Sequence, residues 1–249
     1  MIEQLTLFAV SLVANLFSSF FGGGAGLVQL PALIFLGLPF ALALATHKVA
    51  SVALGLGASL RHWRDGRLEK PMVVLMLLSG LPGVVLGALA IVHIPDRVAE
   101  VLLGVLTIAL GLYSIFKQSL GLQYVAGNRQ GRGLVIGGSG LLFIGFLNGS
   151  LTSGTGLFVT LWLIRWFGMD YLSAVAHTLV MVGIFWNGTG AFTLGVVSEI
   201  YWAWIPVLLL GSLLGGYMGA HLAISSGNRW IKRGFESVTL LIGLKLLLG

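Results

Sequence analysis

The 249-residue sequence contains no cysteine and very little charge. Without cysteine, disulfides, thiol catalysis and cysteine-bound metals are excluded. Charged residues make up 9% of the chain and hydrophobic residues 57%, so there are too few polar groups to cover the surface of a water-soluble protein. This composition predicts an integral membrane protein, whose net charge of +6 belongs to cytoplasmic loops and indicates no nucleic-acid partner.

Acidic side chains are missing from the middle of the apolar segments. The eight acidic residues lie in loops or within the first turns of a segment end: Glu3, Asp65, Glu69, Asp96, Glu100, Asp170, Glu199 and Glu236. A cation carrier usually places a carboxylate inside the membrane, so the site is predicted to be positive and its substrate a small anion. The sequence also lacks a Ser-His-Asp set and an HExxH metal motif, so no enzyme activity, cofactor or metal site is predicted.

Long apolar runs predict membrane helices at 5–37, 40–62, 71–92, 97–116, 133–167, 171–195, 201–224 and 230–248. The N-terminus lacks the basic residues of a signal peptide and is expected to belong to the mature protein. Segments 5–37 and 133–167 exceed the roughly 20 residues that one span needs. Each contains a glycine cluster, "FFGGGAGLVQLP" (20–31) or "GFLNGSLTSGTGLF" (145–158), and is either one bent helix or the two arms of a hairpin.

The chain repeats itself at a spacing of 130 to 132 residues. Gly24-Ala25-Gly26 matches Gly154-Thr155-Gly156, and "ALATHKV" (43–49) matches "AVAHTLV" (174–180). The repeats predict two membrane halves, 1–116 and 133–249, joined by a cytoplasmic linker at 117–132.

Basic residues decide between the bent helix and the hairpin. If all eight segments span the membrane, the thirteen Lys and Arg residues other than Lys48 divide 8 against 5. If the two long segments are hairpins, the same residues divide 11 against 2, with only Arg97 and Lys245 on the minority side. The positive-inside rule therefore favours hairpins.

The predicted fold is an all-α polytopic protein of the inner (plasma) membrane. It has two inverted repeats, each with a broken re-entrant helical hairpin and three transmembrane helices, which is the plan of secondary transporters. Both termini are expected outside the cytoplasm.

Lys48 is the first candidate for the site. It is the ninth residue of its segment and is expected about 13 Å deep, near the middle of a bilayer core about 30 Å thick. Intramembrane charges are usually functional, so we prefer an anion-binding lysine that faces a cavity. The alternative is a lysine that pairs with a helix C-terminus for structural reasons.

Two histidines lie at matching places in the halves, each beside a threonine: His47 with Thr46, and His177 with Thr178. Imidazole can bind an oxyanion or carry a coupled proton, or it can simply satisfy a carbonyl. Leu179 stands where a second lysine would be expected.

The glycine clusters are the third element, because half-helix N-termini and exposed backbone N–H groups bind anions. Close helix packing is the alternative. The candidates are Gly23, Gly24, Gly26, Asn148, Gly154, Thr155 and Gly156, with Ser150, Thr152, Ser153, Asn187 and Gln29 as further donors. Asn15, Ser18 and Ser19 are expected to be packing groups.

These motifs resemble the TauE/SafE (TSUP) family of membrane anion exporters. "GGGAGLVQLPALIFLGLPFALALATHKVAS" is similar to the first-half signature of the family, and "GFLNGSLTSGTGLF" to the second. The sequence departs from the family pattern at Asn148, Ser153 and Leu179. The resemblance implies transport of sulfite, organosulfonates or related anions.

The sequence therefore predicts a secondary transporter, an exporter of a small sulfur-containing anion held near the membrane midplane by Lys48, the histidines and the glycine turns. Its partners are the substrate, the lipid bilayer and a coupled proton. A non-transporting membrane scaffold or receptor is the alternative.

Overall fold

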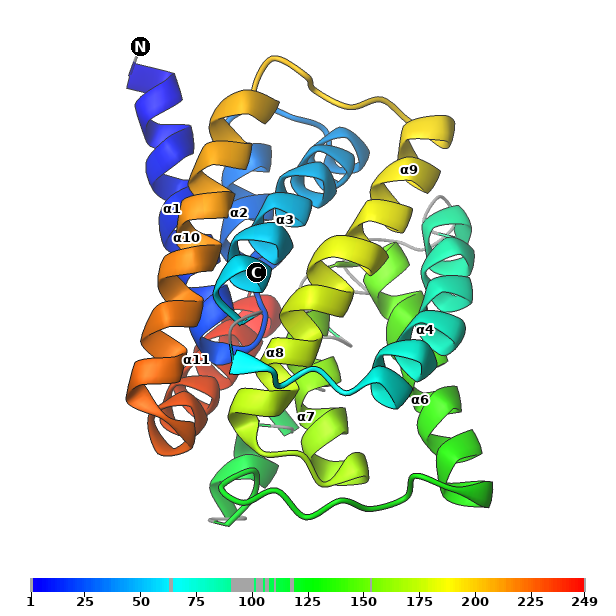
Figure 1. The fold of residues 1–249 in the computed structure, drawn as a ribbon. Helices are drawn as coiled ribbons and strands as arrows, with labels where there is room; N and C mark the ends of the chain where they lie inside the picture. Colours follow the sequence, from blue (N-terminus) through cyan, green and yellow to red (C-terminus); the bar gives the residue numbers. More distant parts are fainter. Residues whose placement is uncertain are drawn as a thin grey trace.

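The computed structural model describes residues 2–62, 65–90, 101, 105, 108–109, 111–116, 119–152 and 154–248. Within these residues every regular element is a helix, as predicted (Figure 1). The helices are α1 (Ile2–Phe21), α2 (Gly26–Phe35), α3 (Phe40–His62), α4 (Lys70–Ala90), α6 (Gly131–Ser150), α7 (Thr155–Phe167), α8 (Tyr171–Val180), a π-helix (Met181–Trp186), α9 (Asn187–Val197), α10 (Ile205–Ser226) and α11 (Asn228–Leu248).

Both glycine clusters form the turn of a hairpin rather than a bend in one helix. At the end of α1, Gly22, Gly23 and Gly24 have φ angles of +89°, +140° and +101°. Glycine adopts these angles without the steric cost that a Cβ atom would bring. The chain then returns as α2 to the end of the molecule where α1 began (Figure 1). Gly154, with φ +74°, directly precedes α7, which returns from α6 in the same way.

The two arms of each hairpin differ in length. α1 and α6 have 20 residues each, whereas α2 and α7 have 10 and 13. At 1.5 Å per residue, the shorter arms cannot cross a bilayer core of about 30 Å. The first arms, α1 and α6, are long enough to cross, and the returning arms are not.

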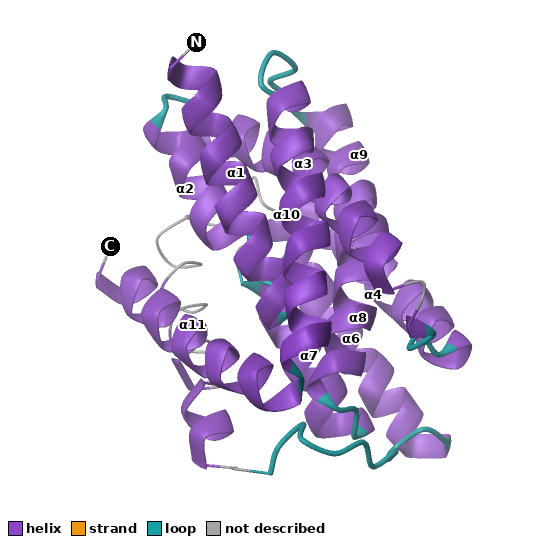
Figure 2. Ribbon diagram, turned by 60° about the vertical axis from the view of Figure 1, so that its left-hand side comes forward, coloured by secondary structure: helices purple, strands orange, loops and turns teal. Residues whose placement is uncertain are grey.

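Six helices in the described part of the chain are long and apolar enough to span: Ile2–Phe21, Leu42–His62, Lys70–Ala90, Gly131–Ser150, Tyr171–Val197 and Ile205–Ser226. This set differs from the predicted spans. Segment 230–248 corresponds to α11, which is not in the set and leans away from the other helices (Figure 2). Most of segment 97–116, Arg97 included, lies outside the described residues.

The helix that begins at Tyr171 is interrupted by the π-helix at Met181–Trp186. The matching helix of the first half, α3, is a single α-helix of 23 residues. The π-helix crosses α3 closely, because a methyl group added at Gly55 would lie 2.7 Å from the carbonyl carbon of Gly183. π-Helical turns often occur at functional sites.

Glycines let the long helices approach backbone to backbone. A methyl group at Gly87 of α4 would lie 2.0 Å from the carbonyl oxygen of Phe146 on α6. A methyl group at Gly219 of α10 would lie 2.2 Å from the carbonyl oxygen of Leu16 on α1. Small residues at such crossings favour helix association in a membrane. Each hairpin thus packs on a long helix of the other half.

Basic residues gather at the end of the molecule opposite the N-terminus. The loop before α4, the linker before α6, the end of α7 and the start of α11 all lie there (Figure 1). These segments carry Arg67, Arg129, Arg165, Arg229 and Arg233. Such a distribution is the one expected if both hairpins return to the side from which they enter.

Candidate functional site

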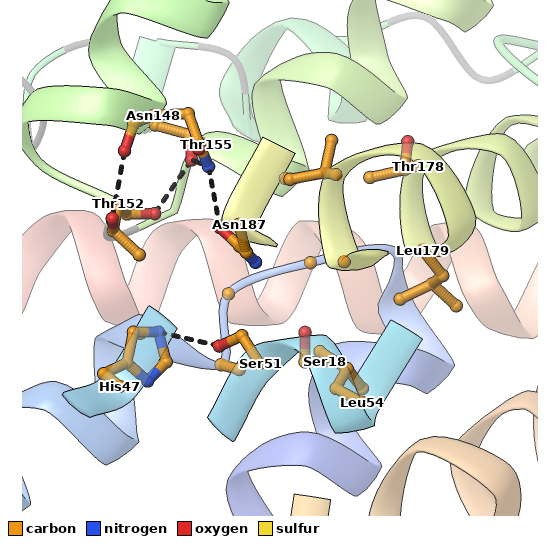
Figure 3. A pocket seen from close by; sticks show the side chains of 17 residues that line it. Ser18, His47, Ser51, Leu54, Asn148, Thr152, Thr155, Thr178, Leu179 and Asn187 are labelled. Atoms are coloured by element: carbon orange, nitrogen blue, oxygen red, sulfur yellow. Dashed lines mark hydrogen bonds between the residues drawn. The ribbon is translucent and has the colours of Figure 1, made fainter. Parts of the chain in front are cut away.

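The tips of the two hairpins meet with no side chain between them. A methyl group at Gly23 would lie 2.5 Å from the carbonyl carbon of Gly156, which is closer than real Cβ contacts. A cavity of about 40 Å³ lies beside this contact. It is lined by Ser18, Gly23, Gly24, Ala25, Gly26, His47, Ser51, Leu54, Asn148, Thr152, Thr155, Gly156, Thr178, Leu179, Val182, Gly183 and Asn187 (Figure 3).

Two helix N-termini and several hydroxyl and amide side chains border this cavity. The first turn of α2, at Ala25 and Gly26, and the first turn of α7, at Thr155 and Gly156, both border it. A helix N-terminus carries a partial positive charge. No acidic residue is among the described lining residues. The wall is therefore suited to an anion.

His47 reaches the cavity from α3 and is held at both ring nitrogens. Its Nδ1 lies 3.1 Å from Oε1 of Gln29, and its Nε2 lies 3.2 Å from Oγ of Ser51 (Figure 3). An amide oxygen only accepts hydrogen bonds, so Nδ1 carries a proton and donates to Gln29. The Ser51 hydroxyl pairs with Nε2.

A buried polar network continues behind His47, between α1 and α10. Asn15 donates from Nδ2 to Oε1 of Gln29 at 3.2 Å and to Oγ of Ser212 at 3.0 Å. Ser19 donates to the carbonyl oxygen of Gly216 at 2.7 Å. Asn15 and Ser19 belong to this network, whereas Ser18 lines the cavity.

Lys48 is fully buried beside the cavity, and the cavity wall does not include it. Its Nζ donates to the carbonyl oxygen of Asn148 at 2.9 Å and lies 3.3 Å from Oδ1 of the same residue. Asn148 belongs to the last turn of α6, where carbonyl groups lack helical partners and carry a partial negative charge. The ammonium group thus neutralises the C-terminus of α6.

The Asn148 side chain connects Lys48 to the cavity. With Oδ1 facing the ammonium group, Nδ2 donates to Oγ1 of Thr155 at 2.9 Å and lies 3.5 Å from Oδ1 of Asn187 (Figure 3). Its orientation follows from charge, because Nδ2 is a donor and could not face Lys48. The lysine therefore sets which end of the amide the cavity meets.

Thr152, between α6 and α7, has φ +58°, which a β-branched residue rarely adopts. Its N–H and its hydroxyl both donate to the carbonyl oxygen of Asn148, at 3.1 Å and 3.0 Å. Backbone strain of this kind costs about 1–3 kcal/mol and is concentrated at functional sites. Ser153, the next residue, lies outside the described residues.

His177 and Thr46 lie outside the cavity. His177 donates from Nδ1 to the carbonyl oxygen of Ser173 at 2.8 Å, and its Nε2 accepts the backbone N–H of Glu69 at 2.9 Å. Thr46 donates to the carbonyl oxygen of Leu42 at 2.7 Å and accepts the backbone N–H of Tyr201 at 3.0 Å. Both side chains therefore hold loops.

The side chain of Glu69 adds an ionic contact to its loop. Its carboxylate accepts hydrogen bonds from Tyr124 and from Arg129, both in the linker before α6. Burial acts to raise the pKa of the Glu69 carboxyl, but these two partners outweigh it and hold the pKa below 4.5. The loop before α4 is thus tied both to α8 and to the linker.

The structure brings together many of the residues that the sequence singled out: Gly23, Gly24, Gly26, His47, Asn148, Thr155, Gly156, Thr178 and Asn187 all line the cavity. Lys48, Thr46, Gly154 and His177 lie around it. Ser51 was missed, although it follows His47 by four residues and so shares its helix face.

Comparison with known proteins identifies a matching family and several similar proteins. A family described as "Sulfite exporter TauE/SafE" matches residues 7–246. The chain is 32% identical over 233 residues to a "Probable membrane transporter protein" of Haemophilus influenzae, covering 91% of this chain and 87% of that one. It is 30% identical over 248 residues to the "Probable membrane transporter protein YfcA" of Escherichia coli (97% and 88%). It is 29% identical over 242 residues to the "Probable membrane transporter protein ORF9" of Sinorhizobium sp (97% and 91%).

Proposed function

The chain belongs to the sulfite exporter TauE/SafE family, and we propose that it transports a compact sulfur oxyanion such as sulfite through the cavity between the hairpin tips. Membership confirms the family resemblance seen in the sequence. The chain is a multi-pass membrane transporter of the TauE/SafE type, as predicted, and not an enzyme.

One observation carries the choice of an anion: two helix N-termini, with hydroxyl and amide side chains, border the cavity, while Lys48 neutralises the C-terminus of α6. The first turns of α2 and α7 direct partial positive charge into the space. Without Lys48, the carbonyl end of α6 would oppose them. The lysine therefore supports anion binding indirectly, through Asn148. This role combines the two interpretations of Lys48, an anion-site charge and a partner of a helix C-terminus.

The size of the cavity supports a compact substrate. One water molecule needs about 10–15 Å³ measured in this way, so 40 Å³ holds about three or four atoms of that size. Sulfite has four non-hydrogen atoms and matches this space. An organosulfonate with a longer tail needs a wider site, so we place it second.

We further propose that the two halves, 1–116 and 133–249, are inverted repeats joined by the linker 117–132. The contacts that support this relation recur at the repeat spacing: Gly87 meets Phe146, and Gly219 meets Leu16. Gly87 and Gly219 are 132 positions apart, and Leu16 and Phe146 are 130 apart. The basic end of the molecule is assigned to the cytoplasm by the positive-inside rule.

Export follows from charge. A negative-inside potential drives an anion outward with about 2.3 kcal/mol per elementary charge per 100 mV. A divalent oxyanion therefore needs no coupling ion to leave the cell. Uptake against the potential would require a co-transported proton or other cation.

The test is flux of radiolabelled sulfite, sulfate, thiosulfate and sulfoacetate into proteoliposomes, with an imposed potassium-diffusion potential and with a pH gradient. We expect sulfite flux that increases with a potential favourable to anions and exceeds sulfoacetate flux. Liposomes without protein give the background. No flux of any of these anions would favour the scaffold or receptor alternative.

A further inference from the structure

Two loops, one at each end of the molecule, are held by the same kind of hydrogen bond. The N–H of Glu69 donates to Nε2 of His177 at 2.9 Å, and the N–H of Tyr201 donates to Oγ1 of Thr46 at 3.0 Å. The donors are 132 positions apart (201 − 69) and the acceptors 131 apart (177 − 46), which is the repeat spacing. Each bond joins a loop of one half to a helix of the other.

Both acceptors lie next to the wall of the cavity. Thr46 precedes His47, and His177 precedes Thr178; His47 and Thr178 line the cavity. The loop before α4 lies at the basic end, and the loop between α9 and α10 lies at the opposite end (Figure 1). Each bond therefore fastens a loop over one side of the cavity-lining helices.

We propose that these two bonds are the latches of the two gates of the cavity, and both are fastened in this structure. The latch at the basic end is Glu69 N–H to His177, and the latch at the other end is Tyr201 N–H to Thr46. Releasing the Tyr201 bond detaches the loop between α9 and α10 from α3. Releasing the Glu69 bond detaches the loop before α4 from α8, while its ionic contact with the linker remains. The inference gives the proposed transport its gates, but its geometry does not depend on which anion is carried.

The latches differ in their response to protons. The N–H of Glu69 needs an unprotonated Nε2, while Nδ1 is already engaged by the carbonyl oxygen of Ser173. A proton on Nε2 removes the acceptor and breaks the latch. A threonine hydroxyl stays an acceptor at every physiological pH. A fall in pH therefore opens the gate at the basic end and not the gate at the opposite end.

Three titratable or charged groups surround His177 and enter this response. They are the Glu69 carboxylate, the Arg129 guanidinium and His62 at the end of α3. Glu69 and Arg129 form an ion pair with each other, so their effects on His177 partly cancel.

The absence of native cysteine makes the gates measurable. A single cysteine in place of Val182, which lines the cavity, reports access to a membrane-impermeant thiol reagent. Oriented vesicles receive the reagent from one side or the other. Thr46→Val and His177→Leu remove an acceptor, and Thr46→Ser and His177→Gln are the matched controls that keep one.

We expect Thr46→Val to raise the labelling rate from the outer side only, and His177→Leu from the basic side only. The expected increase is about 2- to 12-fold, the effect of one hydrogen bond between neutral groups. The controls should stay near the parent. Increases from the same side, or no increase in a folded variant, would overturn the proposal.

A second measurement covers the case in which His177→Leu does not fold. In the parent with Val182→Cys, lowering the pH from about 8 to 5 should raise labelling from the basic side, and His177→Gln should abolish the rise. A rise that persists in His177→Gln would also overturn the proposal. Because labelling needs no substrate, failed labelling tests the latches and failed flux tests the proposed function.

Discussion

The same three positions in the two halves of the molecule carry different side chains: Thr46-His47-Lys48 in α3 and His177-Thr178-Leu179 in α8. In α3 the lysine neutralises the end of the opposite hairpin helix, and the histidine faces the cavity. In α8 the leucine faces the cavity, and the histidine holds a loop.

The two hairpin turns differ in the donors that their carbonyl groups accept. At the end of α1, the carbonyl oxygen of Ser18 accepts hydrogen bonds from the N–H groups of Gly22 and Gly23. The carbonyl oxygen of Gly22 accepts one from the Thr160 hydroxyl. Leu179 lines the same cavity as this end of α1. At the end of α6, the carbonyl oxygen of Asn148 is served by Thr152 and by Lys48. Lys48 therefore adds a charged donor to a carbonyl group that Thr152 already serves, and no charged donor is seen at the Ser18 carbonyl group among the described residues.

The largest effect is expected at the contact of the hairpin tips. Gly23→Ala combines a backbone angle that disfavours Ala with a clash against Gly156, for a loss of about 2–6 kcal/mol of stability. Gly37→Ala is the control, because Gly37 has φ +102° but nothing within 4 Å of the added methyl group. It should cost about 1–3 kcal/mol. Thermal unfolding in detergent measures both, and equal losses would show that the tips can separate freely.

Exchanging the lysine and leucine tests the comparison directly. Lys48→Met should weaken sulfite binding about 10- to 100-fold, because a buried hydrogen bond to a charged group is lost. Leu179→Lys added to this variant should not restore binding, since the end of α1 already has its partners. Binding of radiolabelled sulfite by purified protein measures the loss. Rescue by the second lysine would mean that the two helix ends are equivalent.

A smaller effect is expected at Thr152, which occupies the place of a glycine in the first hairpin. Thr152→Gly relieves backbone strain of about 1–3 kcal/mol and loses a hydrogen bond of about 0.5–1.5 kcal/mol, so stability should change little. Thr152→Val keeps the strain and loses the bond, and should be less stable by about 1 kcal/mol. Thermal unfolding ranks the pair; a Val variant as stable as the parent would contradict the assignment of the hydroxyl to Asn148.

The smallest effect is expected at the ionic contact of the loop before α4, which has no counterpart at Tyr201. Arg129→Gln should cost about 0.2–1 kcal/mol, because the pair is partly exposed. The pKa of Glu69 is below 4.5, so this contribution is present above that pH and is lost as the pH falls through the lowered pKa. Unfolding temperatures of Arg129→Gln and of the exposed control Arg132→Gln, compared with the parent at pH 3 to 8, measure it.

A cost of Arg129→Gln that changes between pH 5 and 8 would contradict the lowered pKa of Glu69. It would also remove the assignment of pH-dependent gating in that range to His177.

The helices and hairpin turns could be predicted because their causes are local. Apolar length marks the helices, and the glycine clusters mark the places where φ must be positive. Cavity residues such as Gly24 and Asn148 could also be predicted, because the repeat indicates that the two glycine clusters have the same role.

Contacts between distant residues could not be predicted. Lys48 meets a carbonyl group 100 positions away, and His177 accepts a backbone N–H 108 positions away. A backbone group has no sequence signature, so nothing in the residue pattern distinguishes a loop-holding histidine from a binding one. The unequal arms of the hairpins were missed because hydropathy records apolar length and not where a chain reverses.

The contact between Gly23 and Gly156 also bears on how tightly a carrier of this kind can avoid leaks. Side chains at a moving contact can change rotamer and absorb a displacement, whereas two backbones in van der Waals contact have no such slack. A shift of one hairpin tip must therefore displace the other in the same step. Such a rigid linkage would make it costly for the cavity to open to both sides at once. The anion gradient would then drive transport cycles and would not dissipate through an open channel.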